Sequence, residues 1–228
     1  MTAGAVVGIG GGGFLQDDTR GLQERYLLAQ CRAARPRVLY LGTAAGDGER
    51  AQLRCYQLFT RLGCEVETLP FFPFEMRRDY GAQARAADLI YVGGGNTVAM
   101  LAVWREFGFD RALEAAWRGG TVLAGVSAGA NCWFAQYVTD SVPGGGLRAG
   151  LGWLPGTFCP HLDGEPWRQP LLDGAPQLPA WGAPDGVMLR FDGQAGFVEA
   201  VSSRPGVAAV VRWPGDAQPM PLPTRLLD

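Results

Sequence analysis

Residues 1–135 alternate between short apolar runs and longer stretches with helical spacing, and this alternation constrains the fold more than any other feature. The apolar runs are nearly continuous, which is typical of parallel strands that are buried on both faces. We therefore predict an α/β fold with a mostly parallel sheet and helices on both of its faces. The expected strands are residues 5–9, 37–41, 65–69, 89–92 and 121–126, and the expected helices are residues 23–33, 50–62, 97–104, 109–118 and 128–135.

The character of the sequence changes after Asp140. Proline and glycine are frequent through residues 142–185, so we predict a loop-rich segment with little regular structure there. Neither an internal repeat nor a linker interrupts the chain, which favours one domain over residues 1–228. Three later runs have the composition of short, antiparallel edge strands near the C-terminus, namely residues 187–191, 197–201 and 207–213.

Composition limits the expected partners and the expected compartment. The formal net charge is −2 and the chain has no run of Lys or Arg, so we expect neither nucleic acid nor an anionic membrane as a partner. Residues 1–13 lack the charged start and apolar core of a signal peptide, and we therefore expect a cytoplasmic protein. The five cysteines contain no Cys-x-x-Cys pair and are expected to be reduced thiols. A single histidine argues against a His-rich metal site.

Ser127 is the strongest candidate for a nucleophile. It lies in Gly125-Val-Ser-Ala-Gly129, a Gly-x-Ser-x-Gly pattern between an expected strand and an expected helix. A serine at such a turn is held in a strained conformation with its hydroxyl exposed. The N–H group of Ala128, at the start of the helix, is suited to stabilising an oxyanion. An ordinary turn of small residues is the alternative interpretation, and Cys132 is a remote second choice as nucleophile.

A serine nucleophile requires a base and a group that orients this base. His161 is the single histidine of the chain and hence the candidate base, with a surface imidazole as the alternative. Asp140, Asp163 and Glu165 are the candidates for the orienting carboxylate. Asp163 and Glu165 lie near His161 in the sequence, whereas Asp140 lies between Ser127 and His161 in chain order.

Two glycine runs follow expected strands. Gly94 and Gly95 precede an expected helix, and their N–H groups are candidates for a second oxyanion donor. Asn96 either contacts the substrate or caps this helix. Residues 8–13 match Gly-x-Gly-x-x-Gly, but the second expected strand ends without the acidic residue that a dinucleotide site requires. We therefore expect residues 8–13 to keep a backbone passage narrow beside the site.

Together these motifs resemble those of peptidase E, the aspartyl dipeptidase family, and of the related cyanophycinases. The resemblance extends from Gly8 to about Arg168. It implies a fold like that of class I glutamine amidotransferase domains, with serine in place of their cysteine. It also implies cleavage of short peptides after an N-terminal aspartate, without metal or cofactor, and relatives suggest a homodimer. The segments that carry it are Tyr91-Val-Gly-Gly-Gly-Asn-Thr97, Gly125-Val-Ser-Ala-Gly-Ala130 and Pro160-His161.

The resemblance assigns a catalytic role to several residues. It implies that Ser127 is the nucleophile, that His161 is the base and that Asp140 is the third member of the triad. Glu165 is the second choice for that third position. An esterase or another small-acyl hydrolase of the same fold remains an alternative function, as does a non-catalytic ligand-binding relative.

The resemblance also concerns the substrate. The oxyanion hole would consist of the N–H group of Ala128 with that of Gly94 or Gly95. Gly164-Glu-Pro-Trp-Arg168 resembles a shortened form of the family's Gly-Glu-Thr-Arg segment. Arg168 would then pair with the aspartate carboxylate of the substrate, a bidentate task for which arginine is suited. An exposed surface charge is the alternative interpretation of Arg168.

Overall fold

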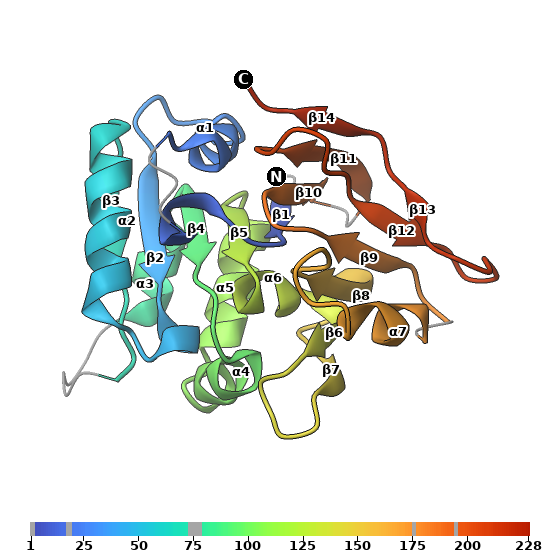
Figure 1. Ribbon diagram of the computed structural model, residues 1–228. Coiled ribbons are helices and arrows are strands. Elements are labelled where there is room, and N and C mark those ends of the chain that lie inside the picture. The colour runs from blue at the N-terminus through green and yellow to red at the C-terminus, as the bar shows by residue number, and fades with distance from the viewer. Residues whose placement is uncertain (1–2, 17–19, 73–78, 175–176, 194–195) are drawn as a thin grey trace.

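The computed structural model describes residues 3–16, 20–72, 79–174, 177–193 and 196–228, and two sheets organise them (Figure 1). The eight-stranded sheet contains β1 (Val6–Ile9), β2 (Arg37–Leu41), β3 (Glu65–Thr68), β4 (Leu89–Val92), β5 (Val122–Val126), β10 (Val187–Phe191), β11 (Phe197–Ser202) and β14 (Thr224–Leu226). The six-stranded sheet contains β6 (Phe134–Thr139), β7 (Gly146–Ala149), β8 (Leu154–Pro160), β9 (Ala180–Ala183), β12 (Val210–Arg212) and β13 (Met220–Pro221).

The centre of the eight-stranded sheet is parallel. Its order is β14-β11-β10-β1-β5-β4-β2-β3. The adjacent strands β1, β5, β4, β2 and β3 pair with one another in parallel. On the other side of β1, β10 pairs antiparallel with β1 and β11 pairs antiparallel with β10, whereas β14 pairs parallel with β11. The strands expected at residues 187–191 and 197–201 therefore lie inside the sheet and not at its edge, because β14 covers β11. The predicted α/β class, with a mostly parallel sheet and antiparallel strands near the C-terminus, is confirmed.

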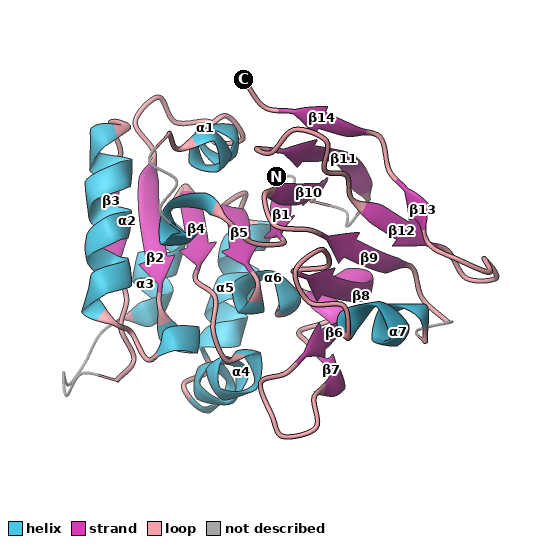
Figure 2. Cartoon of the chain, viewed as in Figure 1, coloured by secondary structure: helices cyan, strands magenta, loops and turns pink. Residues whose placement is uncertain are grey.

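Helices cover both faces of this sheet, as predicted (Figure 2). Successive strand residues point to opposite faces, so Val7 packs with α1 and α2, whereas Val6 packs in the cluster that includes α4 and α5. The helices are α1 (Leu22–Leu28), α2 (Glu49–Arg61), α3 (Tyr80–Ala86), α4 (Thr97–Glu106), α5 (Phe109–Arg118), α6 (Ala128–Asn131) and α7 (Arg168–Asp173), with 3-10 turns η1 (Gly13–Gln16) and η2 (Thr43–Ala45). In the described part of the chain, none of these helices has the length and apolar character needed to cross a bilayer.

The prediction of a loop-rich segment over residues 142–185 is wrong. This segment supplies β7, β8, α7 and β9, and the order of the second sheet is β13-β12-β9-β8-β6-β7. Its prolines and glycines do not exclude strands: Gly156, with φ +109°, lies within β8 where the pairing with β6 shifts register. The helix expected over residues 128–135 is also shorter than predicted, because α6 ends at Asn131 and the chain enters β6.

The two sheets share one apolar core. The ring of Phe134 in β6 stacks on that of Phe158 in β8 at 4.8 Å between centroids, and meets Phe191 of β10 edge-on at 5.4 Å. Gly8 of β1 lies against the same rings, since a Cβ atom there would be 3.2 Å from Phe158 Cε2. This packing fixes the carboxyl end of β8 relative to the carboxyl ends of β1 and β5.

Candidate active site

Ser127 occupies a strained turn directly after β5. Its φ is +54° and its ψ is −111°, a conformation that costs a non-glycine residue on the order of 1–3 kcal/mol. The surrounding backbone holds it there. Its N–H group donates to Ile9 O at 2.9 Å, and its carbonyl accepts from Ala130 and Asn131 at 2.9 Å each. The strained serine at a strand-to-helix turn that the sequence indicates is therefore present.

Glycine is required on both sides of this turn because the backbone is closely approached there. A Cβ atom on Gly125 would lie 2.8 Å from the N atom of Ala130 in α6. A Cβ atom on Gly129 would lie 2.8 Å from the carbonyl carbon of Val92 in β4. Real Cβ atoms do not come this close to backbone atoms, so the pattern Gly-x-Ser-x-Gly reflects the packing of α6 against the sheet.

His161 follows β8, and its ring contacts a carboxylate. Nδ1 of His161 lies 2.6 Å from Oδ1 of Asp185, in the turn that joins β9 to β10. The parallel register of β8 and β9 explains the contact, because Pro160 is paired with Ala183. The residues that follow the two strands therefore emerge side by side.

Asp185 lies outside the motifs that predict the site. The signal available for it was a Pro184-Asp185-Gly186 turn in front of an apolar run, a composition typical of tight turns. Such a turn does not indicate a catalytic role until the pairing of β8 with β9 shows that it lies beside His161. Because 24 residues separate Asp185 from His161, no local pattern connects them.

A glycine segment links the serine turn to the His161–Asp185 pair. Ile9 accepts the hydrogen bond from Ser127, and two residues later Gly11 faces the imidazole. A Cβ atom on Gly11 would lie 2.8 Å from His161 Cε1 and would collide with Asp185 Oδ1. The carbonyl of Gly11 accepts from the N–H group of Gly186 at 2.9 Å. The first glycine run thus lies against both the serine turn and the His161–Asp185 pair.

Protein side chains fill the other side of this glycine run. Gln23 Nε2 donates to Gly11 O at 3.2 Å, and Phe14 N donates to Glu24 Oε1 at 3.1 Å. Both Gln23 and Glu24 are fully buried. A pyrophosphate at these glycines would have to displace them, so this run does not have the open form of a dinucleotide-binding loop.

The second glycine run faces Ser127. A Cβ atom on Gly94 would lie 3.4 Å from Ser127 Cβ and 3.9 Å from Ser127 Oγ. Within the described residues, the N–H groups of Gly94, Gly95 and Ala128 donate no backbone hydrogen bond. By contrast, those of the flanking Gly93 and Asn96 donate to Leu41 O and Ala44 O. Gly94 therefore lies beside the serine hydroxyl, and among the described residues its N–H group has no backbone acceptor.

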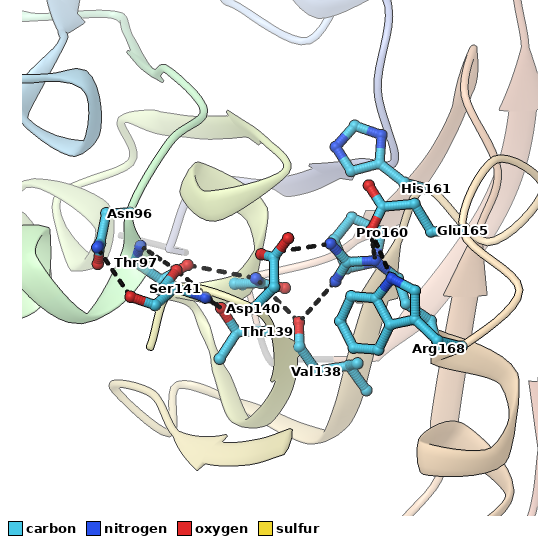
Figure 3. Close-up of polar contacts among 12 residues, drawn as sticks. Asn96, Thr97, Val138, Thr139, Asp140, Ser141, Pro160, His161, Glu165 and Arg168 are labelled. Atoms are coloured by element: carbon cyan, nitrogen blue, oxygen red, sulfur yellow. Dashed lines mark hydrogen bonds and ion pairs between the residues drawn. The ribbon is translucent and has the colours of Figure 1, made fainter. Parts of the chain in front are cut away.

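Asp140 and Glu165, the first and second choices for the carboxylate that orients the base, pair with Arg168 instead (Figure 3). Arg168 Nε donates to Glu165 Oε2 at 2.8 Å, and Arg168 Nη2 lies 3.6 Å from Asp140 Oδ1. In the described part of the chain, neither carboxylate is hydrogen-bonded to His161. Asp140 follows β6, on the opposite side of β8 from β9, so the topology directs it away from the turn that holds Asp185.

Arg168 is not an exposed surface charge. Its side chain is 4% exposed, whereas that of Asp140 is 67% exposed. Nη1 of Arg168 donates to Val138 O at 3.2 Å, and its guanidinium lies over the ring of Trp167 at 4.4 Å. The guanidinium is therefore held in place, with Asp140 covering it on the solvent side.

Comparison with known proteins identifies the family. Residues 6–198 match the model of Peptidase family S51. The chain belongs to the S51 family of serine peptidases. It is 38% identical over 229 residues to the uncharacterized peptidase YgaJ of Bacillus subtilis strain 168, an alignment that covers 97% of this chain and 98% of YgaJ.

Two solved structures have the same fold. The crystal structure of a peptidase from an acI-B1 Actinobacterium aligns with a TM-score of 0.72 and 20% identity, over 98% of this chain and 95% of that one. A peptidase E candidate from Listeria monocytogenes EGD-e aligns with a TM-score of 0.61 and 14% identity, over 92% and 98% of the two chains. These likenesses confirm the fold implied by the resemblance to peptidase E.

In this S51 chain, Asn96 has a structural contact on each side of its amide. Its Oδ1 accepts from Ala99 N at 2.9 Å and so caps α4, and its Nδ2 donates to Ser141 O at 3.0 Å. Ser141 Oγ in turn accepts from Thr97 N at 3.1 Å (Figure 3). These bonds tie the segment that bears Asp140 to the start of α4.

Cys132, the other nucleophile candidate of this S51 chain, is buried in the core. Cys132 is fully buried, its Sγ lies 3.1 Å from Gly129 O, and burial raises the pKa of its thiol well above the ordinary value. A thiol in this state is not a nucleophile at neutral pH. The described residues also contain no group of three or more His, Cys, Asp or Glu side chains arranged to hold a metal ion.

Proposed function

We propose that Ser127, His161 and Asp185 form the catalytic triad of this peptidase. The observation that carries the proposal is the 2.6 Å contact between His161 Nδ1 and Asp185 Oδ1, next to the glycine segment that also holds Ser127. A carboxylate at Nδ1 fixes the tautomer of the imidazole in which Nε2 accepts a proton. Asp185 replaces Asp140 and Glu165 in this assignment because both of those carboxylates pair with Arg168.

The proposed reaction is acyl transfer through an acyl-enzyme. Ser127 Oγ attacks the carbonyl carbon of the scissile peptide bond while its proton passes to His161 Nε2. The imidazolium then gives this proton to the leaving amine as the C–N bond breaks, and Asp185 stabilises the charged ring. Water then attacks the ester carbonyl while His161 Nε2 takes its proton. The imidazolium returns this proton to Ser127 Oγ as the ester bond breaks, and the acid product is released.

The proposed oxyanion hole consists of the N–H group of Ala128 and that of Gly94 or Gly95. These donors have no backbone acceptor among the described residues, and Gly94 lies beside the serine hydroxyl. Donors that are oriented before the reaction lower the barrier without reorganisation, by roughly 3–4 kcal/mol for each one.

The proposed substrates are short peptides that begin with aspartate. Among the described residues, hydrogen bonds occupy two of the five N–H donors of the Arg168 guanidinium. An acidic group of the substrate reaches the remaining donors when the exposed Asp140 side chain moves off the buried guanidinium. The exposed carboxylate of Asp140 lies 3.6 Å from the same guanidinium and can receive an ammonium group. An N-terminal aspartate carries an α-ammonium close to its β-carboxylate, and the Arg168–Asp140 pair is complementary to both charges.

A substrate panel tests this function. Asp-Leu, Asn-Leu and Leu-Leu dipeptides and a set of acyl esters are incubated with the wild type and with Ser127→Ala. We expect hydrolysis of Asp-Leu, much slower hydrolysis of Asn-Leu, and no hydrolysis by Ser127→Ala. Equal rates on Asp-Leu and Asn-Leu would refute the role of the acidic side chain. Faster turnover of the esters than of any peptide would favour an esterase, and hydrolysis by Ser127→Ala would refute the mechanism.

A further inference from the structure

Asp185 is held by its own peptide groups as well as by His161. Its N–H group donates to Asp163 Oδ1 at 2.9 Å, and its carbonyl accepts from Arg204 Nη1 at 3.0 Å. The proposed triad accounts for neither Asp163 nor Arg204. Both peptide groups of the residue that orients the base are therefore anchored by side chains from other segments.

The two anchors also bind each other. Arg204 Nη1 donates to Asp163 Oδ2 at 2.8 Å, which closes a ring of three contacts through Asp185. Asp163 lies two residues after His161, in the turn that follows β8, whereas Arg204 lies just beyond β11. The ring therefore connects the turn that carries the base, the turn between β9 and β10, and the end of a strand in the other sheet.

Arg204 is itself fixed in position. Its N–H group donates to Ser202 Oγ at 3.1 Å, and Ser202 Oγ donates to the Arg204 carbonyl at 2.8 Å. Its aliphatic stem lies on Gly186, where a Cβ atom would be 2.7 Å from Arg204 Cδ. On the other side, Gly186 donates to Gly11 O. The turn that carries Asp185 thus packs against Arg204 on one side and is hydrogen-bonded to the glycine run on the other.

A purely stabilising role does not explain this arrangement. The side chain of Arg204 is 49% exposed and that of Asp163 is 33% exposed, and ion pairs of such exposure contribute little to folding stability. The atoms that the pair holds on Asp185 are backbone atoms, and their position determines where the Asp185 carboxylate meets the imidazole. Partial burial works to raise the pKa of Asp163, but hydrogen bonds from the Asp185 N–H group and from Arg204 outweigh it and lower this pKa. Asp163 is therefore an anion at neutral pH.

We propose that Asp163 and Arg204 are positioning residues that fix the Asp185 peptide and thereby the contact between Asp185 and His161. This inference rests on the proposed triad. When either anchor is removed, the Asp185 carboxylate meets Nδ1 less well and stabilises the imidazolium less. The turnover number then falls, whereas the binding of substrate is unaffected, because among the described residues neither anchor is a partner of Arg168 or Asp140.

Asp163→Ala and Arg204→Ala test the proposal, with kcat, KM and the pH profile of kcat/KM as readouts. We expect kcat to fall about 10–100-fold in both variants, with KM nearly unchanged. We also expect the acid limb of the profile to move to lower pH in both variants, because a less stabilised imidazolium has a lower pKa. A simple charge effect predicts opposite shifts, downward without the Asp163 anion and upward without the Arg204 cation, and that outcome would overturn the proposal.

Conservative variants and a matched control separate loss of these contacts from a general loss of stability. Arg204→Lys retains a cation and a donor, and Asp163→Asn retains an oxygen that can accept from Asp185, so both should recover part of the lost kcat. Arg225→Ala is the matched control, because it breaks a similarly exposed ion pair with Glu199, which lies on β11. We expect wild-type kcat for this control. Urea unfolding of each variant excludes loss of folded protein as the cause.

The rate at which a fluorophosphonate probe labels Ser127 provides a readout that needs no peptide substrate. We expect slower labelling in Asp163→Ala and Arg204→Ala, with the same shift of the acid limb. Wild-type labelling in both variants, while Asp185→Asn is slow, would overturn this inference and leave the triad intact. Wild-type labelling in Asp185→Asn would instead refute the triad itself.

Discussion

Nδ1 of His161 and Oδ1 of Asp185 meet at 2.6 Å across 24 residues of sequence. The parallel pairing of β8 with β9 makes the contact, because both residues emerge from the same end of the six-stranded sheet. Neither Asp140 nor Glu165 offers an equivalent contact, since each is an ion-pair partner of Arg168. The position of Asp185 beside His161 is therefore a consequence of strand order rather than of local sequence.

Substitution of Asp185 should separate the roles of these carboxylates. We expect Asp185→Asn to lower kcat about 10⁴-fold, because an amide that donates to Nδ1 stabilises the wrong tautomer of His161. Asp140→Asn should keep kcat within about tenfold and raise KM for Asp-Leu, because it removes the proposed partner of the substrate ammonium. Steady-state kinetics of the two variants measures both effects. The opposite pattern, with kcat lost only in Asp140→Asn, would refute the assignment.

Gly11 provides a steric test of the same site. In Gly11→Ala the new methyl group would lie 2.8 Å from His161 Cε1 and would collide with the Asp185 carboxylate. We expect a fall in kcat of at least about 100-fold, because the imidazole is displaced from the serine. Gly48→Ala is the control, since its φ is −58° and its nearest neighbour would be 3.8 Å away. Wild-type activity of Gly11→Ala would show that His161 does not act as the base from the position it has in this structure.

The strained backbone at Ser127 predicts a difference between two inactive variants. Both Ser127→Ala and Ser127→Gly lack the hydroxyl, but only glycine adopts a φ of +54° with a ψ of −111° without strain. Relief of strain outweighs the entropy that glycine adds to the unfolded chain. We expect Ser127→Gly to be more stable than Ser127→Ala by about 1 kcal/mol in urea unfolding. Equal midpoints for the two variants would show that the turn is not strained.

Thiol and serine reagents should affect the enzyme differently. Burial raises the pKa of Cys132 well above its ordinary value and raises that of Cys31 to about 12. Since the thiolate is the reactive form, iodoacetamide at neutral pH should leave the activity unchanged. A fluorophosphonate should abolish it by labelling Ser127. Loss of activity with iodoacetamide in step with alkylation of Cys132 would overturn the choice of nucleophile.

The lowered pKa of Asp163 has a consequence for acid stability. A carboxyl group with a lowered pKa in the folded state contributes stability that is fully present above its unfolded value of about 3.9. This contribution is lost as the pH falls through the lowered pKa. The free energy of unfolding of the wild type should therefore fall more between about pH 6 and about pH 3 than that of Asp163→Asn. Identical slopes in the two proteins would mean that Asp185 and Arg204 do not stabilise the anion.

Local sequence patterns account for most of the parallel sheet and for the turn that bears Ser127. The expected strands at residues 37–41 and 89–92 have the bounds of β2 and β4, because buried parallel strands are short continuous apolar runs. Ser127 could be found because close packing of α6 requires glycine on both sides. Asp185 could not be found, because it meets His161 only through the pairing of β8 with β9, strands that the high content of proline and glycine concealed.

The division of the site between two sheets has a consequence during synthesis of the chain. Ser127 follows β5 of the eight-stranded sheet, whereas His161 follows β8 of the six-stranded sheet and Asp185 precedes β10. The ribosome releases the serine turn first, and its base and the carboxylate partner of that base follow only later. In the proposed triad, a nascent chain therefore carries Ser127 without the His161–Asp185 pair until the residues that follow β8 and β9 have been added.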